Sequence, residues 1–133
     1  MIPIYQTIIS DESIGVHGNC FSSCLASIMH LSLDQVPAFQ NRGTNWFSSL
    51  WDFLILHNYE FRGTGRKENA LTYDKGIDGF YIVNGSSPRG FKRGHSVVYK
   101  QGKLIHDPYL TGSGVVDIWS FFMIEPCPRS LTE

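Results

Sequence analysis

Two cysteines four residues apart, Cys20 and Cys24, stand at the start of a predicted helix. Gly18 and Asn19 precede them as loop and cap residues, and Asn19 fits the N-cap, so that Cys20 takes the first helical position. A thiol on the first turn faces unpaired backbone N–H groups and the positive end of the helix dipole, which favour the thiolate. Because only the thiolate is a strong nucleophile, Cys20 is the candidate reactive residue.

The segment from about Cys20 to Leu31 has the pattern of an amphipathic helix. Cys24 lies one turn after Cys20 inside the apolar stripe, and we interpret it as a small buried hydrophobic residue. The same structural interpretation applies to Cys20 unless a histidine lies beside it. The stripe recurs at three- and four-residue steps and consists of Phe21, Cys24, Leu25, Ile28 and Met29.

A predicted hairpin late in the chain supplies both a histidine and an aspartate, and two turns compete in it. A two-residue loop, Gln101-Gly102, would pair Ser96 with Asp107. A three-residue loop that also includes Lys100 would pair His95 with Asp107. We favour the three-residue loop because it matches apolar with apolar residues and keeps each set on one face.

An aspartate opposite His95 would complete a catalytic arrangement. Directly opposite residues have Cβ atoms about 4.5–5.5 Å apart, so the Asp107 carboxylate can accept a hydrogen bond from the imidazole. That bond would fix the tautomer and favour the imidazolium, as a thiolate–imidazolium pair with Cys20 requires. Without a nucleophile nearby, the two residues would be an ordinary surface pair. His106 faces the opposite side in this register, and we interpret it as structural.

The predicted elements are helices first and antiparallel strands afterwards, which indicates an α+β fold in a single domain spanning residues 1–133. A second helix is expected from Trp46 to His57, capped by Asn45, and residues 4–9 are expected to form a short strand or an extended arm. Later strands are expected at Tyr59–Arg62, Phe80–Val83, His95–Tyr99, Lys103–Asp107 and Val115–Ile124, with a loop at Ser86–Gly94 and a connecting stretch at Gly63–Gly79.

Composition narrows the class of protein. Eleven Lys and Arg against twelve Asp and Glu give a net charge of −1, so we expect neither nucleic acid nor a membrane as a partner. An odd cysteine count, no evident signal peptide and no membrane-length apolar run favour the cytoplasm. Cys20, Cys24 and His17 lack a second ligand pair at zinc spacing, and Cys127 is isolated, so no metal and no other cofactor is expected.

The order of a cysteine at a helix start, a histidine on a later strand and an aspartate on the next resembles papain-like cysteine peptidases. The likeness is strongest to bacteriocin-processing peptidases, although these usually have glycine where Phe21 stands. The chain also resembles small uncharacterised phage and bacterial proteins with a Gly-Asn-Cys start and a His-Asp-Pro end. The motifs are Cys20-Phe21-Ser22-Ser23-Cys24, His95-Ser96-Val97-Val98 and Asp107-Pro108.

This resemblance implies a papain-like fold, in which N-terminal helices pack on a C-terminal antiparallel sheet. It implies Cys20 as nucleophile, His95 as base and Asp107 as the residue that orients His95. The family also builds an oxyanion hole from the cysteine N–H and an upstream glutamine. Gln6 is the only glutamine before Cys20 and inherits that role, although it lies farther upstream than the family's glutamine.

We therefore expect a thiol hydrolase or acyltransferase that acts on a peptide, isopeptide or side-chain amide, with a peptide or protein as substrate. The alternative is a non-catalytic binding or inhibitor protein on the same scaffold, such as a phage-encoded ligand trap. Deamidase or transglutaminase-like chemistry would share the triad. Asn19 is an expected substrate contact, and Arg89 or Arg93 in the basic loop before His95 could hold a substrate carboxylate or phosphate, unless that loop is simply solvated.

Overall fold

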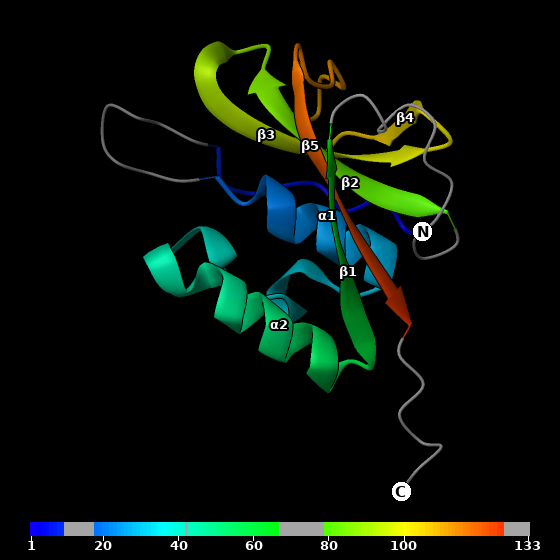
Figure 1. Ribbon diagram of the computed structural model, residues 1–133. Coiled ribbons are helices and arrows are strands. Elements are labelled where there is room, and N and C mark those ends of the chain that lie inside the picture. Colours follow the sequence, from blue (N-terminus) through cyan, green and yellow to red (C-terminus); the bar gives the residue numbers. More distant parts are fainter. Residues whose placement is uncertain (10–17, 42, 67–78, 127–133) are drawn as a thin grey trace, which may run out of the picture.

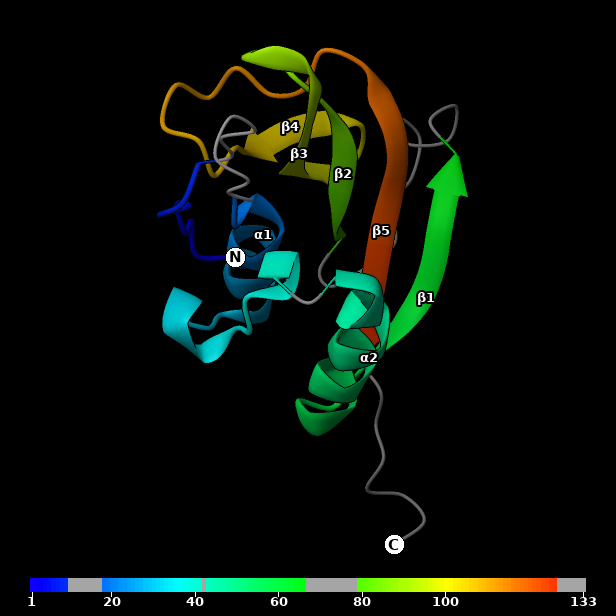
Figure 2. The ribbon, with the colours of Figure 1, turned by 90° about the vertical axis from the view of Figure 1, so that its left-hand side faces the viewer.

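The computed structural model describes residues 1–9, 18–41, 43–66 and 79–126, with the backbone alone for 62–66 and 90–93. In this part of the chain two α-helices pack against a five-stranded antiparallel sheet, so the predicted α+β class is confirmed (Figure 1). Helix α1 lies against β2 and β3, and helix α2 lies against β1 (Figure 2). Neither helix is long and apolar enough to span a membrane.

Helix α1, Cys20–Met29, is buried from Ser22 to its end. Its buried serines all have partners: the Ser23 and Ser27 hydroxyls each donate to the backbone carbonyl four residues earlier, and the Ser22 hydroxyl donates to the Pro37 carbonyl. These bonds let polar side chains lie in a buried helix without an unpaired group. The helix ends at His30, which adopts a left-handed conformation with φ of 59° and donates its N–H to the Ala26 carbonyl. It is therefore slightly shorter than predicted.

Helix α2, Trp46–Leu56, has nearly the predicted range. It buries Leu50, Phe53 and Leu54, whereas Trp46 and Trp51 stay 40% and 44% exposed. The chain between the two helices is made of the 3₁₀ turns η2 (Leu33–Gln35), η3 (Phe39–Asn41) and η4 (Gly43–Asn45).

The sheet has the strand order β1-β5-β2-β3-β4. The last strand therefore lies between the first two, and every neighbouring pair is antiparallel. The strands are β1 (Tyr59–Arg66), β2 (Phe80–Ser87), β3 (Gly90–Lys100), β4 (Lys103–His106) and β5 (Ile118–Pro126).

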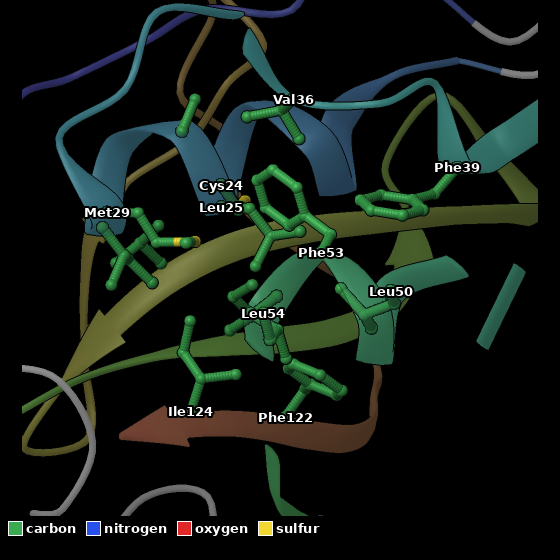
Figure 3. Packing of buried hydrophobic residues seen from close by; sticks show 14 residues of the cluster. Cys24, Leu25, Met29, Val36, Phe39, Leu50, Phe53, Leu54, Phe122 and Ile124 are labelled. Carbon is green, nitrogen blue, oxygen red and sulfur yellow. The ribbon is translucent and has the colours of Figure 1, made fainter. Parts of the chain in front are cut away.

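The main core lies between the helices and one face of the sheet (Figure 3). Ile82, Val98 and Phe122, on three neighbouring strands, meet Leu25 of α1 and Leu54 of α2 in this cluster. The opposite face carries a second cluster, formed by Tyr81, Val83, Val97 and Phe121. The alternation of the two sets along each strand is the two-residue period of a sheet that is covered on both faces.

The predicted loop at Ser86–Gly94 is wrong. Strand β2 continues to Ser87 and β3 already begins at Gly90, so the connection is a tight turn. Gly85 suggested a strand end, but it is a site of close approach: a Cβ there would lie 2.1 Å from the Asp117 carbonyl oxygen. Glycine is needed because neighbouring backbone occupies the place of a side chain.

The favoured three-residue turn of the β3–β4 hairpin is also wrong. Lys100 pairs with Lys103, and the turn residues Gln101 and Gly102 have φ of 51° and 78°. Positive φ at both positions is typical of a two-residue type I′ turn, whose twist suits a hairpin. The Gly102 N–H donates to the Tyr81 hydroxyl at 3.0 Å, a long-range contact that supports this turn.

Residues 1–9 form the extended arm, not a strand. The Ile2 N–H donates to the Ser27 carbonyl of α1, and the Gln6 N–H donates to the Pro108 carbonyl after β4. His106 is buried and its Nε2 lies 2.7 Å from the Ile4 carbonyl oxygen. His106 was predicted to be structural, and in the structure its side chain holds the N-terminal arm against the hairpin.

Candidate active site

His95 and Asp107 form a buried pair next to the end of the hairpin. The distance between His95 Nε2 and Asp107 Oδ1 is 2.6 Å. Asp107 is the partner predicted for His95, but the strand pairing that brings the two residues together is not the predicted one. The ladder shifts by a bulge between Tyr99 and Val98, so that Val98 pairs with His106, and Asp107 follows the last residue of β4. The carboxylate therefore reaches His95 from the start of a loop and not from the directly opposite strand position.

The Asp107 carboxylate is held at both oxygens. Besides His95, Oδ1 accepts the Tyr109 N–H at 2.9 Å, and Oδ2 accepts the Gly114 N–H at 2.7 Å. Burial would raise the pKa of Asp107, but the bonds from the imidazole and from these two backbone groups outweigh it and lower the pKa. Asp107 is therefore a fixed anion at neutral pH.

The Cys20 thiol lies beside His95 and Ser96. Burial would raise the pKa of this thiol, but the hydrogen bond and charge of His95, together with the backbone N–H and hydroxyl of Ser96, lower it below the ordinary value of 9.0. Of the two His95 ring nitrogens, Nε2 is hydrogen-bonded to Asp107. The other, Nδ1, is buried and has no other group to bond among the described residues, so it is the nitrogen that can interact with the Cys20 sulfur.

His95 is held in its charged form by its two neighbours. Burial would lower the pKa of the imidazole, but the hydrogen bonds to Asp107 and Cys20 and the charges of both raise it from 6.5 to about 9. The lowered thiol pKa and the raised imidazole pKa both favour a thiolate–imidazolium pair. Such a pair combines a nucleophile with a proton donor at one place.

Cys24, one turn farther along α1, has the opposite character. It is fully buried in the main core, and burial, followed by the charges of Cys20 and Asp107, raises the pKa of its thiol well above the ordinary value. Both cysteines are free. The predicted role of Cys24 as a buried apolar residue is confirmed by this position.

Sequence reasoning missed a row of polar side chains in the sheet. Ser96, Asn84 and Ser120 are paired across three neighbouring strands, β3, β2 and β5. They continue the helix-facing positions of the core, two residues beyond Val98, Ile82 and Phe122. The Ser96 hydroxyl donates to Asn84 Oδ1 at 2.7 Å. We call Ser96, Asn84 and Ser120 the polar row. The polar row lies at the boundary between the apolar core and the candidate site. In the sequence it could have been recognised as a polar residue at a core-facing position in each of three apolar strands.

Asn19 does not cap α1 with its side chain. Its Oδ1 instead accepts the backbone N–H groups of Thr7 and Ile8, at 3.0 and 2.9 Å, and its Nδ2 donates to the Thr7 hydroxyl. Asn19 is the N-cap residue of α1, as predicted, although its side chain makes no capping hydrogen bond. The side chain binds the N-terminal arm to the start of the helix, and its expected substrate contact stays a prediction.

The structure does not bring Gln6 into a described contact with Cys20. Gln6 Nε2 donates to the Ile8 carbonyl at 2.8 Å, and Oε1 is buried with no hydrogen-bond partner in the part of the chain that the structure describes. The side chain lines a small cavity of about 310 Å³ together with Pro108 and Tyr109. Its proposed oxyanion role stays a prediction.

Of the two basic residues expected near the site, Arg89 has a described side chain. Its guanidinium carbon lies 3.6 Å from the centre of the Tyr109 ring, a cation–π contact close to Asp107 in sequence. The Arg93 and His17 side chains and Cys127 lie outside the described residues. Among the residues that are described, no group of three His, Cys, Asp or Glu side chains has the arrangement of a metal site.

Comparisons with known proteins found no relative of this chain. No family model matches it, and no similar curated protein and no similar solved structure is found.

Proposed function

We propose that this protein is a thiol hydrolase or acyltransferase that acts on a peptide, isopeptide or side-chain amide. The observation that carries the proposal is the chain of contacts from Asp107 through His95 to Cys20, with a lowered thiol pKa and a raised imidazole pKa. Cys20 is only half-buried, so a carbonyl group can approach the sulfur. A nucleophile, its base and an orienting carboxylate in contact are the parts that acyl transfer needs.

In the first half of the reaction, the Cys20 thiolate attacks the carbonyl carbon and a C–S bond forms. The imidazolium of His95 then gives its proton to the departing nitrogen, and the C–N bond breaks. The products are a free amine and a thioester on Cys20. Asp107 keeps Nε2 hydrogen-bonded throughout, which leaves Nδ1 as the nitrogen that carries the transferred proton.

In the second half, neutral His95 takes a proton from water or from an acceptor amine, which attacks the thioester. The C–S bond breaks, and the acyl group leaves as an acid or a new amide. The proton stays on His95 and the sulfur leaves as a thiolate, so the thiolate–imidazolium pair is restored. Hydrolysis, deamidation and transfer differ only in the amide that is cleaved and in the acceptor.

The carbonyl oxygen becomes negative in the tetrahedral intermediate, and the start of α1 can stabilise it. The Cys20 N–H belongs to the first helical residue and has no carbonyl partner within the helix. The positive end of the helix dipole points the same way. Gln6 is the proposed second donor, since only one of its two amide hydrogens is needed for the Ile8 carbonyl.

The proposal includes a papain-like fold and a cytoplasmic location. The fold is supported by a helix that begins at the cysteine and by a sheet that carries the histidine. The location is supported by the two free thiols, which a reducing compartment keeps unpaired.

A substrate screen tests the proposal. The protein is incubated with a peptide library that includes isopeptides and glutamine side chains, with and without an added primary amine, and the products are identified by mass spectrometry. We expect cleaved, deamidated or amine-linked products with the native chain and none with Cys20→Ala. Peptides that bind without being modified would overturn the proposal in favour of a binding protein.

A further inference from the structure

A cavity of about 680 Å³ lies between the two helices and the sheet. This volume is within the range of small-molecule sites. Its walls are mostly aromatic, and its polar lining residues are Gln40, Asn84 and Ser120, none of which is charged. The full lining is Phe21, Phe39, Gln40, Gly43, Trp46, Phe47, Asn84, Ser120 and Phe122.

The cavity adjoins the thiol on two sides. Phe21, in its wall, directly follows Cys20 in α1. Asn84, also in its wall, accepts the hydrogen bond of the Ser96 hydroxyl, and Ser96 interacts with the Cys20 sulfur. The cavity wall is therefore linked to the reacting atom through Phe21, the next residue in the chain, and through Asn84 and then Ser96, as the wall of a substrate site would be.

The aromatic walls are already in contact with one another. The Phe21 ring meets the Trp46 ring edge-on, with centroids 6.3 Å apart, and the Phe122 ring at 5.4 Å. Trp46 and Phe47 are 40% and 38% exposed, so part of each ring is left uncovered by the protein. Rings in this arrangement offer faces and edges to a further aromatic group.

Gln40 supplies the second, independent sign of a ligand. Its Nε2 and Oε1 are both buried, and neither has a hydrogen-bond partner among the described residues. An unpaired buried carboxamide is costly, because both its donor and its acceptor have lost water. A secondary amide satisfies both atoms at once, since it offers one N–H and one carbonyl oxygen.

From these observations we infer that the cavity binds the acyl part of the substrate, as an uncharged group with an aromatic ring and a secondary amide, and that Gln40 pairs with this amide. The ring lies among Phe21, Trp46 and Phe122. A charged group is disfavoured because no lining residue would compensate for its lost water. This inference rests on the proposed function for the role of Cys20, and it names the substrate class.

The test measures binding without catalysis, so that its failure is distinct from failure of the proposed function. N-benzylacetamide is titrated into the full chain carrying Cys20→Ala, and the side-chain amide signal of Gln40 and the indole signal of Trp46 are followed by NMR. N-methylacetamide, which lacks the ring, and phenylacetate, which is charged, are titrated in parallel. We expect saturable shifts with N-benzylacetamide and binding at least about tenfold weaker with each of the others.

Three variants locate the contacts. Gln40→Leu keeps the approximate shape but removes both polar atoms, and should weaken N-benzylacetamide binding about fivefold. Trp46→Ala should weaken it as well. Its control is Trp51→Ala, because Trp51 lies on the same helix and is similarly exposed but is outside the cavity lining. Circular dichroism of each variant shows that it is folded.

Binding of N-benzylacetamide that is weakened in Gln40→Leu and Trp46→Ala and unchanged in Trp51→Ala would support the inference. It would be overturned by the absence of saturable shifts, by equal binding of phenylacetate, or by unchanged binding in Gln40→Leu. None of these results depends on turnover, which the substrate screen measures separately.

Discussion

Cys20 and Cys24 carry the same functional group on the same helix, one turn apart, yet the structure gives them opposite acidity. The pKa of Cys20 is lowered, and the pKa of Cys24 is raised well above its ordinary value. Both are penalised by burial. The difference is that Cys20 meets His95 and Ser96, where the sheet turns polar, whereas Cys24 meets the apolar core. Position on the helix alone therefore does not make a cysteine reactive; the sheet beside it does.

The largest expected effect separates these two residues. Cys20→Ala should abolish turnover of any substrate found in the screen, since the attacking atom is removed. Cys24→Ala should keep turnover, because its thiol only fills space in the core. Turnover assays on both purified variants, with thermal unfolding as a check of folding, make the comparison. Loss of activity in a folded Cys24→Ala chain would contradict the division of roles.

The next effect concerns the carboxylate. Asp107→Asn keeps the size of the side chain but removes the charge that supports the imidazolium, and we expect turnover to fall about 10²- to 10⁴-fold. The Tyr109 N–H still has an oxygen to bond, but the amide nitrogen replaces the oxygen that accepts the Gly114 N–H, so thermal unfolding of the variant is measured as a check of folding. Measurement of kcat/KM over a pH series checks the expected fall in turnover. An unchanged rate would mean that Asp107 only anchors its loop.

A smaller effect is expected at Ser96. Ser96→Ala removes the hydroxyl near the thiol but leaves the Ser96 backbone N–H, so the pKa of Cys20 should rise and its alkylation by iodoacetamide at pH 6 should slow by about two- to fivefold. Mass spectrometry of the alkylated peptide gives the rate at Cys20 alone. A rate equal to that of the native chain would remove Ser96 from the account.

The helices could be predicted closely because their signals are local. The apolar period and the loop residues before Cys20 placed the start of α1, and Asn45 with the pattern after it placed α2. The Asn19 side chain makes no capping hydrogen bond for a tertiary reason, since the backbone of Thr7 and Ile8 competes for its oxygen and wins.

The hairpin shows the limit of pattern matching. Pairing of apolar residues favoured the wrong turn, because a bulge near Val98 and the bond from Gly102 to the Tyr81 hydroxyl cannot be read from the hairpin's own residues. His95 and Asp107 still meet, because Asp107 lies on a loop that can reach. Gln40 was beyond prediction, since its burial depends on how η3 packs against the two helices.

The central claim is that His95 activates Cys20, and the pH dependence of iodoacetamide alkylation at Cys20 tests it most directly. In the native chain the reaction should persist well below the ordinary thiol pKa of 9.0. In His95→Ala only the Ser96 groups still oppose the effect of burial on the thiol pKa, so the curve should shift to higher pH and the rate at pH 7 should fall by at least about tenfold. Two curves that coincide at the ordinary thiol pKa would contradict the account.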